Sequence, residues 1–272
     1  MPDRQDDRTS FGATEKPGGW LGRKMRESAG RQWANLAQRA LRSRRSPDIH
    51  LCDEARLLHA DLTRFLQRAD ALQEGRKGQT LPDLPPGTDW KWQLLSMRGG
   101  ISPAAVIGPQ SGRRFGSELA LWHDCARHAL ILRQLPNRTR PVHPAFGLQL
   151  EILGFSGSYL SLSLDLPDEI LTGLDRRQVL RLDTIMQAER AITVYARLNL
   201  VQGPNTETIL RQMGHPIDGP NAQRNVEFDL AYADLAEQPV SKVWLDLIFE
   251  KPNMNAVTIH DLILSRHPRA AV

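Results

Sequence analysis

The sequence predicts a mainly β protein, in which an antiparallel β-sandwich of jelly-roll type follows an N-terminal helical hairpin. From residue 88 onward, apolar residues recur at every second position, and clusters of Gly, Pro, Asn and Asp interrupt this pattern. No repeated crossover helices separate the alternating stretches, which indicates antiparallel sheets that share one core. A barrel of about eight to ten strands is the alternative architecture.

The first part of the chain has a different character. Residues 1–19 are polar and rich in Gly, Pro and Asp, which predicts a disordered lead. From Trp20 the apolar residues are spaced three and four apart, as on one face of an α-helix. This face comprises Leu21, Met25, Ala29, Trp33, Leu36, Ala37, Ala40 and Leu41. Nine Lys and Arg residues stand between Lys16 and Arg45 beside a single acid, Glu27, so the predicted helix is amphipathic and basic.

A second helix is predicted after Ser46, Pro47 and Asp48, which read as a stop and a new N-cap. Its apolar residues form a heptad stripe: Leu51, Ala55, Leu58, Leu62, Phe65, Ala69 and Leu72. We expect this helix to pack on the first as a hairpin or on the following domain, with a short homotypic coiled coil as the alternative. The two helices span residues 20–74, and the prolines of residues 75–87 indicate a linker.

Residues 88–272 form the predicted sandwich domain. Ten stretches alternate as strands do, among them ELALWHD, GLQLEILGF, SYLSLSLDL and KVWLDLIFE. The strictest alternation is AITVYARLNLVQGPNTE, residues 191–207. One face of this stretch is predicted to be buried and comprises Ile192, Val194, Ala196, Leu198 and Leu200. Thr206 to Met213 is the best helical option within the domain.

The opposite face of the same stretch predicts a ligand-binding surface. Tyr195, Arg197 and Asn199 offer a stacking ring, a guanidinium fork and an amide on a rigid sheet. If neighbouring strands pair, Arg181 and Asp183 join this face, which would suit a saccharide or another polar ligand. The alternative is that Arg197 pairs with Asp183 or Asp165 across strands and recognises nothing.

Motifs of catalysis are absent, so the sequence predicts no catalytic residue, cofactor or metal site. It contains no phosphate-binding loop, no dinucleotide fingerprint and no metal-binding His pair. GFSGS, at Gly154 to Ser158, is interpreted as a hairpin turn. WHDC, at Trp122 to Cys125, is interpreted as a buried cysteine beside a hydrogen-bonded histidine. Carboxylates on the strands leave an enzyme acting on saccharides as an alternative.

The cellular setting is expected to be cytoplasmic. The chain has two cysteines in segments of different character, which indicates a reducing compartment. Its first residues lack the apolar region of a signal peptide, and no run of about 18 apolar residues predicts a membrane span.

The basic helix predicts a contact surface. Trp20, Arg23, Lys24, Arg26 and Trp33 are the residues expected to touch an anionic membrane or a partner, with the protein peripheral at the inner membrane surface. Nucleic acid is the less favoured ligand of this helix, and a helix packed by its apolar stripe is the structural alternative. A protein partner could instead use the heptad helix.

Several stretches together carry a resemblance to a known family. GWLGRKMRE, LPPGTDWKWQ, ELALWHDC, GFSGSYLSLSLDLP and YARLNLVQGPNTE resemble a family of bacterial proteins of unknown function, over nearly the whole chain. The resemblance implies a soluble bacterial protein and transfers no catalytic residue. The last strands, LDLIFE and AVTIHDLILSR, are also similar in style to those of jelly-roll carbohydrate-binding modules.

The function predicted from these features is that of a non-catalytic binding or adaptor protein. Its sandwich presents a polar ligand face, and its basic helix contacts a membrane surface or a partner. The alternatives are a saccharide-active enzyme that uses sheet carboxylates and a structural module that binds a partner through the heptad helix.

Overall fold

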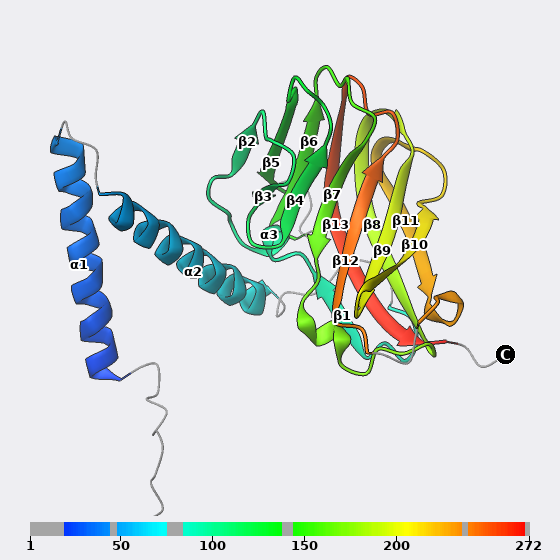
Figure 1. The fold of residues 1–272 in the computed structure, drawn as a ribbon, viewed down its shortest axis with the longest axis horizontal. Helices are drawn as coiled ribbons and strands as arrows, with labels where there is room; N and C mark the ends of the chain where they lie inside the picture. The colour runs from blue at the N-terminus through cyan, green and yellow to red at the C-terminus, as the bar shows by residue number, and fades with distance from the viewer. Residues whose placement is uncertain (1–18, 44–47, 75–83, 138–143, 236–238, 270–272) are drawn as a thin grey trace, which may run out of the picture. The chain divides into compact units, whose positions relative to one another are not determined.

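The computed structural model describes residues 19–43, 48–74, 84–137, 144–235 and 239–269 (Figure 1). The chain divides into two compact units, Met1–Leu58 and His59–Val272. All but the last residue of the expected disordered lead of residues 1–19, and residues 75–83 of the expected linker of residues 75–87, lie outside the described residues.

Two helices precede the sandwich, α1 at Trp20–Arg42 and α2 at Ile49–Glu74. On α1, Trp20, Leu21 and Met25 are exposed. On α2, the heptad residues Leu58, Leu62 and Phe65 are exposed as well. The hairpin packing of the two helices and a partner for the heptad stripe therefore stay predictions. None of the described helices combines the length and the apolarity that crossing a membrane requires.

The first sheet has seven strands. Its order is β11 (Ile217–Asp229), β8 (Gln178–Ile192), β13 (Asn255–Pro268), β6 (Phe146–Ile152), β5 (Leu130–Pro136) and β2 (Ala105–Ile107), and β1 (Trp90–Gln93) pairs with the far end of β13. All of these pairings are antiparallel.

The second sheet has six strands, also antiparallel. Its order is β10 (Asn205–Gln212), β9 (Val194–Gln202), β12 (Lys242–Phe249), β7 (Leu160–Asp165), β4 (Leu119–His123) and β3 (Arg113–Phe115). Three short helices complete the described elements: α3 (Leu95–Arg98), η1 (Asp168–Leu171) and η2 (Leu230–Tyr232).

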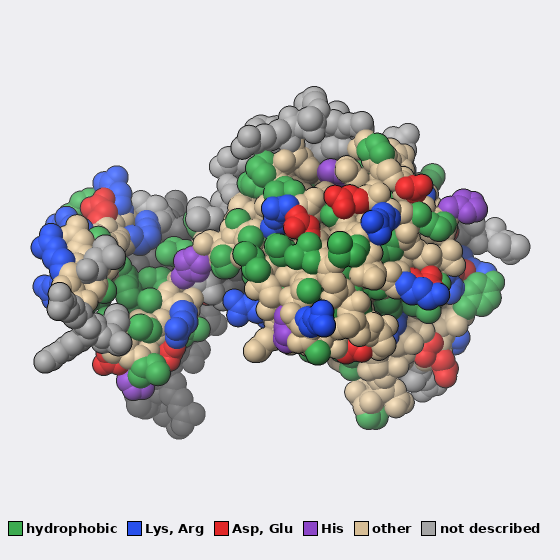
Figure 2. Space-filling model, turned by 90° about the horizontal axis from the view of Figure 1, so that it is seen from above, with side chains coloured by type: hydrophobic (Ala, Val, Ile, Leu, Met, Phe, Trp, Pro, Cys, Tyr) green, Lys and Arg blue, Asp and Glu red, His purple; other side chains and the backbone are tan. Residues whose placement is uncertain are grey.

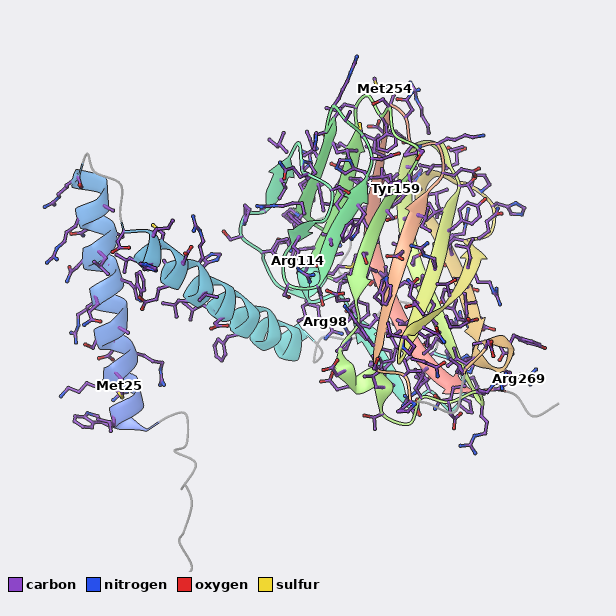
Figure 3. The ribbon with its side chains drawn as sticks, viewed as in Figure 1. Met25, Arg98, Arg114, Tyr159, Met254 and Arg269 are labelled. Carbon is purple, nitrogen blue, oxygen red and sulfur yellow. The ribbon has the colours of Figure 1, made fainter. Side chains whose placement is uncertain are left out.

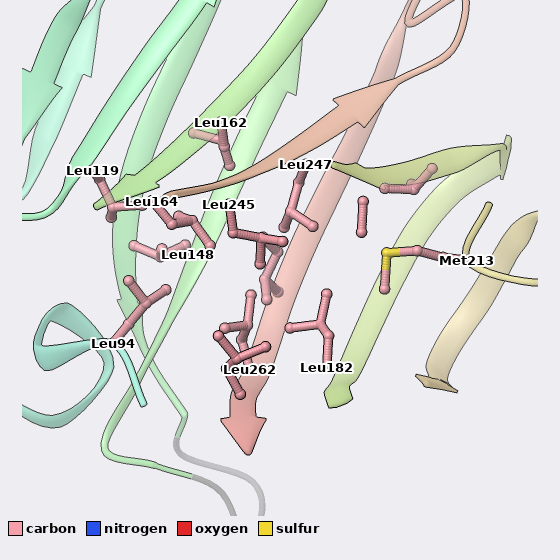
Figure 4. Packing of buried hydrophobic residues seen from close by; sticks show 14 of the residues in the cluster. Leu94, Leu119, Leu148, Leu162, Leu164, Leu182, Met213, Leu245, Leu247 and Leu262 are labelled. Atoms are coloured by element: carbon pink, nitrogen blue, oxygen red, sulfur yellow. The ribbon is translucent and has the colours of Figure 1, made fainter. Parts of the chain in front are cut away.

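The core lies between the two sheets and is built mainly of leucine (Figure 4). Strand β9 illustrates its origin, because every second residue from Val194 to Leu200 is buried, as the alternation predicts. The predicted mainly β, antiparallel sandwich is thus confirmed. Two separate sheets replace the barrel that was the alternative.

One local prediction is wrong, because Thr206 to Met213 is not helical. A tight turn at Gly203 and Pro204 sets Asn205 opposite Gln202, and β10 then pairs with β9 residue by residue up to Gln212. The ladder of backbone hydrogen bonds and the burial of Ile209 favour the strand over the helix.

Candidate functional site

A groove of about 460 Å³ lies on the outer face of the six-stranded sheet. We call it the outer groove. Its aromatic residues are Trp122, Tyr159 and Trp244, and its charged residues are Arg114, Asp165, Arg197, Lys242 and Asp246. Ala120, Ser161 and Ser163 complete its lining. Arg114 and Tyr159, labelled in Figure 3, come from β3 and from the segment that precedes β7.

The strand register explains why this face is hollow. The row across the sheet runs from Arg197 on β9 through Asp246 on β12, Ser163 on β7 and Ala120 on β4 to Arg114 on β3. Small residues therefore occupy the middle of the row. The neighbouring rows supply Trp122 opposite Ser161 and Trp244 opposite Asp165. Large side chains consequently surround a floor of small ones.

Asp246 fixes the guanidinium group of Arg197. Nε and Nη2 of Arg197 donate to Oδ2 of Asp246 at 3.1 and 2.8 Å. Nδ2 of Asn199 donates to the same oxygen at 2.9 Å. Asn199 and Asp246 are both buried, whereas Arg197 is partly exposed. Asn199 thus positions the carboxylate from within the sheet, and Arg197 is the member of the network that a ligand can reach.

A second charged network lies beside Trp244. Nη2 of Arg114 is 2.7 Å from Oδ2 of Asp165, and it also donates to the backbone carbonyl of Ser117. Nζ of Lys242 is 3.8 Å from Oδ1 of Asp165 and 5.7 Å from the centroid of the Trp244 ring. The carboxylate of Asp165 is therefore shared by two cations from different strands.

The Trp122 ring is about half exposed and packs over Gly112. A Cβ atom at Gly112 would lie 3.2 Å from the ring, so a larger residue there would displace it. The ring presents its surface to the outer groove, where it can stack on a flat ligand.

Tyr159 is held at the groove by Asp124. Backbone N–H groups of Ser158 and Tyr159 donate to Oδ1 of Asp124 at 2.7 and 3.1 Å, and the Ser158 hydroxyl donates to Oδ2 at 2.6 Å. These hydrogen bonds lower the pKa of Asp124 to about 2, the Ser158 hydroxyl contributing most. Gly157 is required at this turn, since a Cβ there would lie 2.1 Å from Oδ1 of Asp124.

Comparison with known proteins identifies the family. A family model described as a family of unknown function (DUF6478) matches residues 13–272. The chain belongs to this family. The resemblance noted in the sequence is thereby confirmed, while no curated protein matches the chain.

Carbohydrate-binding modules are among the solved structures similar to this DUF6478 chain. The family 11 module of Clostridium thermocellum, in complex with a mixed-linked tetrasaccharide, is 9% identical with a TM-score of 0.37, over 59% of this chain and 96% of the module. The C-terminal family 22 module of Clostridium thermocellum Xyn10B is 10% identical with a TM-score of 0.37, over 71% of this chain and all of the module.

Tailspike protein 4 of bacteriophage CBA120 is also similar, at 10% identity and a TM-score of 0.38 over 54% of this chain. This chain spans only 19% of that tailspike structure. No functional residue is transferable from any of these proteins at such levels of similarity.

The residues predicted as one ligand face are divided between the two sheets. Tyr195, Arg197 and Asn199 lie on β9, and of these Arg197 lines the outer groove. The expectation that Arg181 and Asp183 share their face is wrong, because both lie on β8 in the seven-stranded sheet. There they pair with each other at 2.8 Å. The chain passes from one sheet to the other at Thr193, although the alternation of the sequence continues across it.

The sequence prediction missed most of the outer groove. Trp122, Trp244, Asp246, Arg114 and Lys242 stand on strands that are distant in the chain and are joined only by pairing. A signal for two of them exists in the sequence, since Trp122 and Trp244 occupy polar-face positions of alternating stretches.

The WHDC stretch has a structural role. His123 is buried, and its Nδ1 accepts the backbone N–H of Cys125 at 3.1 Å while Nε2 lies 2.9 Å from the Pro109 carbonyl. Burial raises the pKa of the Cys125 thiol, but hydrogen bonds from Ser156, Ala129 and Arg127 outweigh it and bring the pKa to about 7. The histidine ring thus engages the cysteine backbone rather than its sulfur. Among the described residues, no group of three or more metal-ligating side chains is present.

Proposed function

We propose that this chain is a non-catalytic binding protein whose outer groove binds a saccharide. The observation that carries the proposal is the floor of small residues between Trp122 and Trp244, with hydrogen-bonding groups fixed beside them. A sugar ring has an apolar face, which stacks on indole, and an edge of hydroxyl groups, which need directional donors and acceptors. The outer groove supplies both on a rigid sheet.

The charged side chains of the groove favour binding over catalysis. Glycosidic hydrolysis requires one carboxylic acid that donates a proton and a second carboxylate. Asp246 already accepts hydrogen bonds from Arg197 and Asn199, and Asp165 is held between Arg114 and Lys242. Both carboxylates therefore serve to position cations, which is the role expected in a recognition surface.

Truncation of a groove tryptophan tests the proposal. Full-length protein is screened on a glycan array, and the affinity for each hit is measured by isothermal titration calorimetry. Trp122→Ala should weaken binding about thirtyfold, because a stacked aromatic ring is a typical binding hot spot. Trp20→Ala, which removes an exposed tryptophan of α1, is the matched control and should leave the affinity unchanged. Glycan binding that survives Trp122→Ala and Trp244→Ala would contradict the proposal.

A second candidate function is contact with an anionic membrane surface through α1, which would make the protein peripheral at the inner membrane surface of the cytoplasm. The basic side chains of α1 gather on the left of Figure 2, and Trp20, Leu21 and Met25 are exposed beside them. Nζ of Lys24 lies 4.6 Å from the centroid of the Trp20 ring. Exposed apolar groups beside cations are the composition that binds at the headgroup level.

Vesicle flotation tests this second function. The triple variant Arg23→Gln, Lys24→Gln, Arg26→Gln should lose binding to phosphatidylglycerol vesicles, at about 1 kcal/mol per cation. Arg113→Gln, Arg177→Gln, Arg190→Gln removes three cations of the sandwich domain and should bind as the wild type does. Two results would contradict an electrostatic anchor. One is equal recovery of both triple variants with the phosphatidylglycerol vesicles, and the other is binding of the wild type to vesicles made only of phosphatidylcholine.

A further inference from the structure

The cations of the outer groove are more exposed than its carboxylates. The side chains of Arg114, Arg197 and Lys242 are 53, 43 and 61% exposed, whereas those of Asp246 and Asp165 are 5 and 38% exposed. Three positive charges thus stand against two negative charges at this surface. A ligand that enters the groove meets a positive surface.

The pairing of these groups shows where the excess charge lies. Among the cations that the structure describes, Asp246 pairs with Arg197 alone, so that pair is neutral. Asp165 serves both Arg114 and Lys242, so one negative charge stands against two positive charges. The unmatched positive charge therefore lies at the Asp165 end of the groove, beside the ring of Trp244.

Arginine N–H groups that bond to no described residue also indicate an anionic ligand. Nε and Nη2 of Arg197 bind Asp246, while its Nη1 makes no hydrogen bond to any residue that the structure describes. In Arg114, Nη2 makes both of the hydrogen bonds to residues that the structure describes. Nε and Nη1 are left for a ligand. These two groups point to different edges of the guanidinium plane, so each can donate a single hydrogen bond to a ligand oxygen.

We infer that the saccharide bound in the outer groove is acidic: a chain that contains uronic acid residues. A sugar carboxylate binds at the Asp165 end, where Lys242 and Arg114 supply the unmatched charge, and a sugar ring stacks on Trp122 or Trp244. This inference rests on the proposed saccharide-binding function and specifies its substrate class. Cations at the rim of a site steer and select charged ligands more than they add affinity for neutral ones.

Matched pairs of oligosaccharides test the inference. Oligomers of galacturonate, glucuronate and mannuronate are compared by calorimetry with their methyl esters, which keep the ring geometry and remove the charge. We expect at least one acid to bind about tenfold more tightly than its ester at low salt, with a difference that shrinks as salt rises. Equal affinities for acid and ester, or binding of neutral glycans alone, overturn the inference and leave the proposed function standing. Absence of any glycan binding overturns both.

Two variants with opposite expected effects locate the charge. Lys242→Gln should weaken binding of the acid about fivefold and that of the ester much less, since the lysine ammonium lies beside the Asp165 carboxylate and the Trp244 ring. Asp165→Asn should strengthen binding of the acid, because it removes a negative charge that repels a sugar carboxylate at that end. Arg190→Gln, an exposed cation on the other sheet, is the matched control. If Arg190→Gln weakened binding of the acid as much as Lys242→Gln does, only the net charge of the protein would matter. That result would overturn the position assigned to the sugar carboxylate.

Discussion

The outer faces of the two sheets are both polar, but they differ in lining among the described residues, where the face of the six-stranded sheet is lined as a ligand site would be. On the seven-stranded sheet, Arg181 pairs with Asp183, and Arg133 pairs with Glu151. On the six-stranded sheet, Arg197 and Asp246 form a similar pair, but serines and an alanine lie beside them and tryptophans stand at the margins. Polar alternation alone thus makes a solvated face, and the size of the side chains in each row decides whether it can bind.

Buried carboxylates underline this difference. Asp261 lies buried on β13, where burial raises its pKa to about 6 despite hydrogen bonds from Gln93 and from the Leu262 backbone. Its partners Gln93 and Leu262 lie on β1 and β13 of the seven-stranded sheet. Asp246 is equally buried, but its partner Arg197 extends to the groove. A buried aspartate therefore bonds within the seven-stranded sheet, whereas on the six-stranded sheet it orients an arginine that a ligand can reach.

The largest effect is expected from filling the hollow. Ser163→Tyr places a large ring in the middle of the row between Asp246 and Ala120. We expect loss of at least about a hundredfold in glycan affinity, because the ligand and the new ring compete for the same space. Thermal unfolding should change little, since Ser163 faces away from the core. Unaltered affinity measured by calorimetry would show that the ligand binds elsewhere.

The next effect separates the two buried carboxylates that pair with arginine. Asp246→Asn and Asp183→Asn should each lower the free energy of unfolding by about 1–2 kcal/mol, because each weakens a buried, charge-assisted hydrogen bond. Only Asp246→Asn should also weaken glycan binding, by about tenfold, since it releases Arg197. Urea unfolding and calorimetry on both variants give the comparison. A similar loss of binding in Asp183→Asn would erase the distinction between the faces.

A smaller effect concerns the loop that carries Tyr159. The pKa of Asp124 is about 2 in the folded protein against an ordinary value of 3.8, so its hydrogen bonds stabilise the loop above about pH 4 and are lost as the pH falls toward 2. The backbone amide signals of Ser158 and Tyr159 in NMR spectra should move over this range.

Asp124→Asn should show the altered signals already at neutral pH and weaken glycan binding about threefold. Asp175→Asn is the matched control, because Asp175 also has a lowered pKa, through Arg177, but lies outside the groove. Loop signals that ignore both the pH and the Asp124 substitution would show that Asp124 does not hold Tyr159 in place.

Local pattern was sufficient for the fold and insufficient for the site. The alternation from Ile192 to Leu200 predicts which side chains are buried, because burial on a strand depends on a period of two. It cannot predict which strands are neighbours, because β9 lies between β10 and β12, and β12 is about 40 residues away in the chain. The sequence therefore predicts Arg197 at the site but not its partner Asp246. It also places Arg181 on the same face as Arg197, although the chain changes sheets at Thr193.

The central claim is that a saccharide binds across the tryptophans of the outer groove. The chain has six tryptophans, and their indole N–H signals can be followed in ¹⁵N–¹H NMR spectra during titration with the glycan that binds most tightly. The account predicts that the signals of Trp122 and Trp244 shift, while those of Trp20, Trp33, Trp90 and Trp92 stay in place. Shifts confined to the latter four, with Trp122 and Trp244 unchanged, would contradict it.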